Sequence, residues 1–167
     1  MKKHLHKTLI AAACGLAMSA GAQAATVAFE HTDPNDFRDI RATDQGQKKF
    51  EESVLRELED QFREEAAALP EGQTLQVTLK DLDLAGDVEY FHRYYPFGLR
   101  VVRNVDIPRM EFSYVLRGAN GEVISEGDEE IKDLGFRTNL FTNRSSMDPL
   151  DYERHMISEW ARENLRG

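Results

Sequence analysis

The acidic segment "DLDLAGDVEYFH", at residues 81–92, contains the side chains best suited to chemistry. Its carboxylates and its imidazole are Asp81, Asp83, Asp87, Glu89 and His92. Carboxylate oxygens are the ligands that hard cations prefer, and a histidine among carboxylates can bind zinc or transfer protons. The segment could therefore be a metal or catalytic site, or the end of a strand and the loop that follows it.

The segment resembles the start of an EF-hand calcium loop but departs from it at two positions. Ala85 stands where the loop needs an oxygen ligand, and His92 stands where it needs a bidentate glutamate. A looser cation site formed by Asp81, Asp83 and Asp87 stays open, because hard cations need only oxygen ligands in suitable geometry.

Zinc binding and nucleophilic catalysis have weaker support in the sequence. A zinc site would need His92 to be joined by His31 or His155 from distant parts of the chain. No G-x-S-x-G motif is present, and helix capping accounts for Ser145 and Ser146. We therefore predict no catalytic residues and no cofactor.

The residues before the acidic segment predict a strand over 73–84. Leu75, Val77 and Leu79 alternate with polar residues, so one face is buried. Continued alternation would bury Asp81 and Asp83, which is costly for unpaired carboxylates. Either the strand has a bulge near residue 80, or its pairing ends there, or a cation or arginines satisfy the two carboxylates.

Arginines and aromatic residues follow in the 85–108 segment, which we predict to be a long loop. Arg100, Arg103 and Arg109 could reach back to Asp81 and Asp83 as guanidinium–carboxylate pairs. The aromatic residues are Tyr90, Phe91, Tyr94, Tyr95 and Phe97. They could cover the core as a lid or form an exposed recognition surface, and we favour the lid because large exposed apolar patches are uncommon.

Residues 1–24 have the three parts of a secretory signal peptide. "MKKHLHK" is positively charged, "TLIAAACGLAMSAG" is apolar, and "AQA" permits cleavage between Ala24 and Ala25. A lipoprotein acylated at Cys14 is less favoured, because "AAAC" lacks a large aliphatic residue three positions before the cysteine. The apolar run is also too short for stable membrane insertion.

Cleavage would leave a single domain at 25–167 that contains no cysteine. This composition excludes disulfides, thiolate metal sites and a cysteine nucleophile. The remaining chain has 18 basic and 30 acidic side chains, for a net charge of −12. Such a charge argues against nucleic-acid binding, because phosphates would be repelled.

Two helices are predicted from apolar residues at three- and four-residue steps. The first has Phe50, Val54, Leu58, Phe62, Ala66 and Leu69 on its buried face. Thr43 or Asp44 is expected to cap its start, and Pro70 with Gly72 to stop it. The second is expected to start with Asp148 as cap and Pro149 as its first residue. Its buried residues are expected to be Leu150, Ile157, Trp160, Ala161 and Leu165.

Asn120 and Gly121 predict a hairpin with a two-residue type I′ turn, because this pair tolerates positive φ. The expected pairs are Gly118 with Val123, Leu116 with Ser125, Tyr114 with Gly127, and Met110 with Ile131. A short strand at 25–30 completes the order strand, helix, strand, loop, strand, strand, helix. We predict an α+β fold, a mixed sheet of about four strands with two helices packed on one face.

Three stretches resemble one known family: "GQTLQVTLKDLDLAGD", "RVVRNVDIPRMEFSYVLRGANGEVISEGDEEIKDLGF" and "DPLDYERHMISEW". It is the bacterial envelope family called domain of unknown function 3016. The resemblance implies an exported, periplasmic, single-domain protein without an established activity. It also marks positions of interest: Asp81, Asp83, Gly86, Arg100, Arg103, Pro108, Arg109, Gly127, Asp133, Tyr152, Glu153 and Trp160.

Two classes of function remain open. The favoured one is a non-catalytic binding or interaction module of the cell envelope, whose partner would be an envelope protein. Its candidate surface is Tyr94, Tyr95, Phe97, Arg100 and Arg103. The alternative is a metal-dependent enzyme or cation-binding protein centred on the three aspartates named above. The sequence predicts no oligomeric state.

Overall fold

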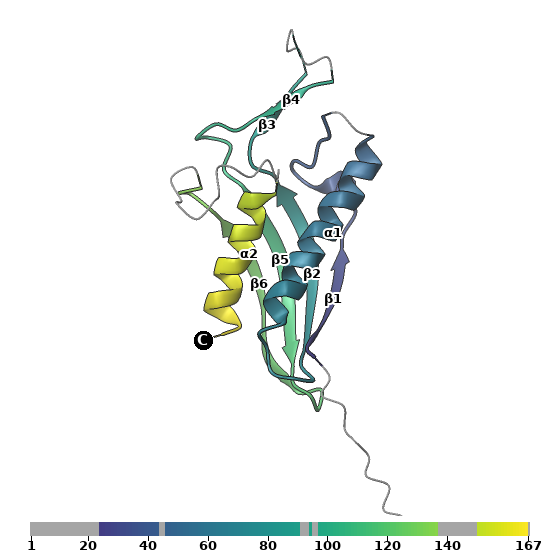
Figure 1. The fold of residues 1–167 in the computed structure, drawn as a ribbon, viewed down its shortest axis with the longest axis vertical. Coiled ribbons are helices and arrows are strands. Elements are labelled where there is room, and N and C mark those ends of the chain that lie inside the picture. The colour runs from purple at the N-terminus through teal and green to yellow at the C-terminus, as the bar shows by residue number, and fades with distance from the viewer. Residues whose placement is uncertain (1–23, 44–45, 91–93, 95–96, 137–149, 167) are drawn as a thin grey trace, which may run out of the picture.

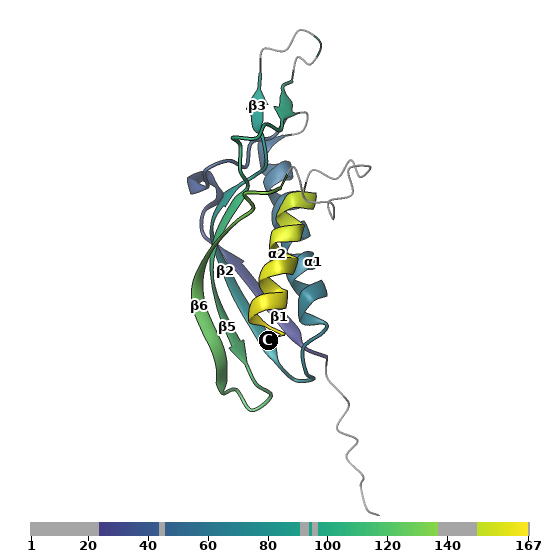
Figure 2. The same ribbon diagram turned by 90° about the vertical axis from the view of Figure 1, so that its left-hand side faces the viewer.

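A mixed four-stranded sheet with two helices on one face forms the body of the protein (Figures 1 and 2). The computed structural model describes residues 24–43, 46–90, 94, 97–136 and 150–166. The elements are β1 (Thr26–His31), the 3-10 turn η1 (Pro34–Asp36), α1 (Gln47–Ala66), β2 (Thr74–Asp83), β3 (Asp87–Glu89), β4 (Leu99–Val101), β5 (Arg109–Arg117), β6 (Val123–Lys132) and α2 (Asp151–Asn164). The predicted α+β class and element order are confirmed.

The first strand, helix and second strand form a parallel crossover. β1 and β2 pair in parallel from Thr26 opposite Thr74 onward, and α1 returns across the sheet between them. The predicted apolar face of α1 is confirmed, with Val54, Leu58 and Phe62 almost fully buried. Amphipathic packing against the sheet thus explains why this segment is helical.

The start of α1 differs from the prediction. Gly46 is the N-cap and makes no side-chain capping bond, so Thr43 is not the N-cap residue, and Asp44 lies outside the described residues. Gln47 instead accepts a hydrogen bond from the Ala42 backbone N–H and donates one to the Ile40 carbonyl. These bonds attach the preceding segment to the start of the helix.

The β5–β6 hairpin has the predicted pairing over most of its length. Leu116 lies opposite Ser125, Tyr114 opposite Gly127, and Met110 opposite Ile131. The turn itself differs, since Val123 lies opposite Arg117 rather than Gly118, and the register shifts there.

Only Gly121 has positive φ in this turn, so the type I′ prediction is wrong. The Gly121 N–H donates to the Gly118 carbonyl, and the Gly118 N–H donates to the Glu122 carbonyl. This is the longer loop in which a turn is followed by a left-handed glycine and a bulge, and it uses the same Asn-Gly pair.

α2 begins at Asp151, three residues after the predicted cap. Leu150 is its N-cap and makes no side-chain capping bond. Asp148 and Pro149 lie outside the described residues. The predicted buried residues Leu150, Ile157, Trp160 and Ala161 are buried, and Leu165 is partly buried. No helix in the described ranges combines the length and apolarity needed to cross a membrane.

An aromatic cluster fills the core between the helices and the sheet. The Trp160 ring on α2 meets Phe112 and Tyr114 at centroid distances of 4.9 and 5.0 Å, in edge-on geometry. Phe62 on α1 lies 5.5 Å from Phe112 and 5.9 Å from Trp160. Such pairs stabilise beyond simple area burial, so this cluster joins both helices to β5.

The predicted 85–108 loop contains a short antiparallel ribbon, β3 with β4, that projects beyond one end of the sheet (Figures 1 and 2). We call residues 87–101 the arm. Gly86 precedes it with a φ of 86°, and a Cβ there would lie 2.8 Å from the Val101 carbonyl oxygen. Only glycine permits this approach, which brings the two sides of the arm together at its base.

Replacement of Phe62 by alanine should lower the free energy of unfolding by about 4 kcal/mol, because it leaves a cavity among packed rings. Phe97→Ala is the matched control, since Phe97 is 70% exposed, and should change stability by less than about 0.5 kcal/mol. Urea unfolding followed by circular dichroism measures both. Similar losses in the two variants would contradict the core described here.

Candidate interaction site

A bulge in β2 turns the acidic segment away from the core. The register against β5 shifts between Leu79 and Asp81, while both Leu79 and Leu82 are fully buried. Asp81 and Asp83 are half-buried, and pairing continues to Asp83 opposite Arg109. The bulge predicted near residue 80 is therefore confirmed, and the alternative that pairing ends there is wrong.

Asp81 is paired with Arg38, not with Arg100, Arg103 or Arg109 as predicted. The Arg38 backbone N–H donates to Asp81 Oδ1 at 2.8 Å, and its Nε lies 3.0 Å from Oδ2. The reason is topological. Residues after η1 run beside the end of β2, where the Asp39 N–H donates to the Leu82 carbonyl at 3.1 Å.

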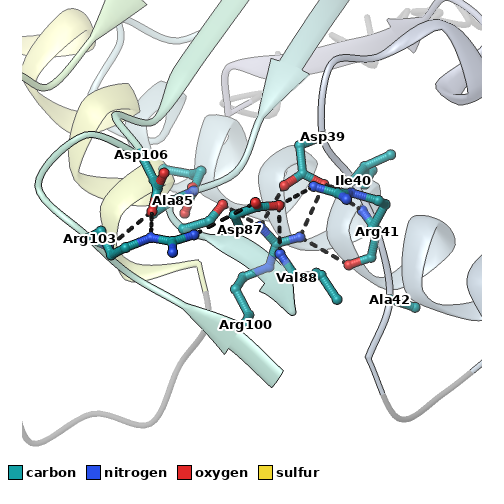
Figure 3. A network of polar contacts seen from close by, with 12 residues as sticks. Asp39, Ile40, Arg41, Ala42, Ala85, Asp87, Val88, Arg100, Arg103 and Asp106 are labelled. Carbon is teal, nitrogen blue, oxygen red and sulfur yellow. Dashed lines mark hydrogen bonds and ion pairs between the residues drawn. The ribbon is translucent and has the colours of Figure 1, made fainter. Parts of the chain in front are cut away.

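Arg100 forms a buried pair with Asp39 (Figure 3). Its Nη1 donates to Asp39 Oδ2 and to the Gly86 carbonyl, both at 2.9 Å, and its Nη2 donates to the Arg41 carbonyl at 3.0 Å. The side chains of Arg100 and Asp39 are only 13% and 8% exposed. Burial would raise the pKa of Asp39, but hydrogen bonds from Arg41 and Arg100 outweigh it and lower that pKa.

A second, more exposed set of ion pairs surrounds the base of the arm (Figure 3). Arg41 pairs with Asp87, and Arg103 binds Asp106 at 3.1 Å and Glu89 at 3.0 Å. These contacts are solvent-screened and contribute little stability individually. They fix where the arm starts, whereas the predicted pairing of Arg103 with Asp81 or Asp83 is wrong.

Asp83 and Arg109 lie opposite each other across β2 and β5, beside an open depression of about 320 Å³. Burial, followed by repulsion from Asp39, raises the pKa of Asp83 despite the attraction of Arg109 and Arg38. The buried Nε of Arg109 has no hydrogen-bond partner among the described residues. This depression, which aspartates and arginines line, can therefore accept a polar group.

The three aspartates weighed as cation ligands have different surroundings. Asp81 faces Arg38, Asp87 faces Arg41 and Arg103, and Asp83 lies opposite Arg109. Within the described ranges, no three His, Cys, Asp or Glu side chains come close enough to hold a metal ion. His92 lies outside these ranges.

Glu153 is a buried carboxylate that the family resemblance marked, although it was not among the residues predicted to face the core. It is fully buried on α2, and its Oε1 accepts a hydrogen bond from the Ala85 N–H at 2.8 Å. Its Oε2 is buried without a partner among the described residues. Burial raises the pKa of Glu153 to about 7. Its spacing from Leu150, Met156 and Ile157 placed it on the buried face, and that signal could have identified it.

The described aromatic residues of the arm are exposed. Tyr94 is 75% exposed, Phe97 is 70% exposed and Tyr90 is 47% exposed. The prediction that this aromatic run covers the core is therefore wrong for these three residues. Phe91 and Tyr95 lie outside the described residues. Of the predicted recognition surface, Tyr94 and Phe97 are accessible, whereas Arg100 is buried in the base of the arm.

Arg100→Ala should destabilise the protein by about 3 kcal/mol, because it removes the buried one of the two arginines that pair with the buried Asp39 carboxylate. Lysine at this position should not restore stability, since it cannot make the forked contacts of a guanidinium. Arg103→Ala is the control and should cost less than about 1 kcal/mol, because its pairs are exposed. Hydrogen exchange should show β3 and β4 amides unprotected in Arg100→Ala alone. Equal protection in both variants would contradict the role of Arg100.

Glu153→Gln should remove a pH dependence of stability. Between pH 4.5, the ordinary pKa, and about 7, the folded protein keeps a proton that the unfolded chain has released. The free energy of unfolding of the unmodified protein should therefore fall through this range, by about 3 kcal/mol relative to the variant. Denaturant unfolding at several pH values measures the difference. Exposed Glu159→Gln is the control, and parallel curves for Glu153→Gln would refute the prediction.

Comparison with known proteins places the chain in a family. No match was found among the curated proteins. The model of the family described as "Protein of unknown function (DUF3016)" matches residues 25–163, which include the sheet, both helices and the arm. The chain belongs to this family of proteins of unknown function, DUF3016.

Proposed function

We propose that the protein is an exported, periplasmic, non-catalytic binding module of the bacterial cell envelope, and that its arm recognises a partner protein. The observation that carries the proposal is the exposure of Tyr94 and Phe97 on a ribbon whose base is fixed by the buried pair of Arg100 and Asp39.

Exposed aromatic side chains fit recognition of a protein surface. Aromatic residues are enriched at the buried centres of protein interfaces, where they contribute much of the binding free energy. A soluble chain gains nothing by leaving Tyr94 and Phe97 in water, since burying either would be favourable. Their exposure is most simply explained by a partner that covers them.

The fixed base of the arm favours the same conclusion. Arg100 binds backbone carbonyls on both sides of the junction, so the start of the arm is held in one position. A preorganised surface loses less conformational entropy on binding than a free loop does. The ion pairs therefore hold the arm in position for binding. This role explains the cluster of charged residues without requiring that they catalyse a reaction.

Export is supported by the sequence pattern of residues 1–24 and by the family match, which begins at residue 25, directly after the expected cleavage point. An envelope location makes other envelope proteins the partners that the arm can meet.

Photo-crosslinking in living cells tests the proposal. A benzophenone amino acid at position 94 or 97 should give a discrete crosslinked protein, and N-terminal sequencing of the same purified chain should begin at Ala25. Position 134 is the control, because Leu134 is 73% exposed and lies outside the arm.

The partner identified in this way should bind the purified Tyr94→Ala/Phe97→Ala variant at least about 30-fold more weakly, as expected for interface residues worth about 2 kcal/mol. Leu134→Ala should leave the affinity unchanged. Crosslinks of equal yield at 94, 97 and 134, or undiminished binding by the double variant, would refute recognition through the arm.

A further inference from the structure

The outer edge of the sheet is a second surface, independent of the arm. β6 occupies one end of the order β1-β2-β5-β6, so its outer backbone groups pair with no other strand in the described part of the chain. It is ten residues long, and every one of its side chains is exposed or half-buried. Long unpaired edges readily accept an additional strand.

A groove of about 450 Å³ lies between this edge and α2. In Figure 2, β6 borders the sheet and α2 lies beside it in the helical layer. Ile131 from β6 and Met156 with Trp160 from α2 supply apolar lining. A strand added to β6 would direct alternate side chains into this groove, because successive residues point to opposite faces.

Both faces of the β6 edge are acidic. Glu129 lines the groove together with Glu159 and Glu163 of α2, although both of these also contact Arg162. On the opposite face of the sheet, Glu126 and Asp128 are exposed, and Asp128 pairs with Lys80. His155 and Lys132 are the basic groups in the groove lining. Negative charge therefore flanks an added strand on both sides.

One of the residues that line the groove has an unsatisfied hydrogen-bond donor. Trp160 is 97% buried and lines the groove, and its indole N–H has no acceptor among the described residues. A buried donor without a partner is uncommon and costs free energy. A carbonyl or side-chain oxygen of a bound segment could supply the missing acceptor.

We propose that β6 and the α2–β6 groove bind an extended, lysine- or arginine-rich segment of a partner protein by strand addition. Backbone pairing at the edge gives affinity, alternate apolar or long side chains enter the groove, and basic groups meet the acidic side chains. A second copy of this chain is a poor occupant, because two acidic β6 edges would repel each other.

Trp160 is the only tryptophan of the chain, so its fluorescence reports on the groove directly. The probe is a ten-residue peptide of alternating lysine and valine. It should change Trp160 emission and protect β6 backbone amides from hydrogen exchange. Its glutamate–valine counterpart should do neither, and a version with proline at two central positions should lose the amide protection.

Matched variants separate local recognition from general attraction to an acidic protein. Glu129→Gln/Glu130→Gln removes two charges from the edge and should weaken peptide binding about fivefold at low salt. Glu64→Gln/Glu71→Gln removes two exposed charges outside the groove and should leave binding unchanged. Circular dichroism spectra of both variants should match that of the unmodified protein, which would show that they fold.

Four results would overturn the proposal. These are no binding by the lysine–valine peptide, equal binding by the glutamate–valine peptide, equal weakening by the two charge variants, and undiminished amide protection by the proline-containing peptide. Self-association of the chain through β6 at low peptide concentration would also overturn the proposal, because it would make a second copy of the chain the occupant of the edge.

Discussion

The buried pair between Arg100 and Asp39 is the interaction on which the arm depends. Arg100 donates to Asp39 and to the carbonyls of Arg41 and Gly86 (Figure 3). One guanidinium thus joins the arm to residues 39–41 and to the turn at Gly86. A guanidinium suits this position because its planar donors can meet several acceptors at once. Removing both charges from water is costly, and only complete hydrogen bonding makes such a pair tolerable. Its main contribution is therefore the unique position of the arm.

The turn at residues 85 and 86 links this pair to the helical layer. Ala85 donates its N–H to Glu153 of α2, and Gly86 presents its carbonyl to Arg100 of the arm. An acidic side chain thus binds the N–H of Ala85, and a basic side chain binds the carbonyl of the next residue, Gly86. The positive charge of Arg100 lowers the pKa of Glu153, but burial has the larger effect and raises it. A continuous chain of contacts therefore runs from α2 to the base of the arm.

Local patterns in the sequence predicted most of the fold. Alternation at Leu75, Val77 and Leu79 identified β2, and the change of parity at Asp81 made a bulge near residue 80 one of the alternatives, which the structure confirms. The turn type was mistaken because Asn120 and Gly121 suit two loop lengths, and only the positions of neighbouring residues select one. The alternation in β2 and the Asn-Gly pair of the hairpin each depend on a few neighbouring residues, so both can be recognised without knowledge of tertiary contacts.

The site was less predictable, because its partners come from distant segments. Arg100 was close enough in sequence to be paired with Asp81, but Arg38 occupies that position since residues after η1 run beside β2. Nothing local distinguishes these two arginines. The exposure of Tyr94 and Phe97 was one of two alternatives that the sequence left open, and it was the less favoured one because large exposed apolar patches are uncommon. Whether an aromatic residue is covered depends on where the arm points, and that direction is set by the buried pair at its base.

The two surfaces place different demands on the same small scaffold. The arm must keep aromatic side chains exposed and in position, which requires costly buried charges at its base. Under the proposed strand addition the β6 edge must stay open to a partner, and its acidic side chains disfavour pairing with a second acidic edge. The arm projects beyond the end of the sheet while β6 runs along its side, so the residues of the two surfaces do not overlap (Figure 1). Occupation of one surface therefore leaves the contacts of the other intact, and each can be altered by substitution without rebuilding the core between them.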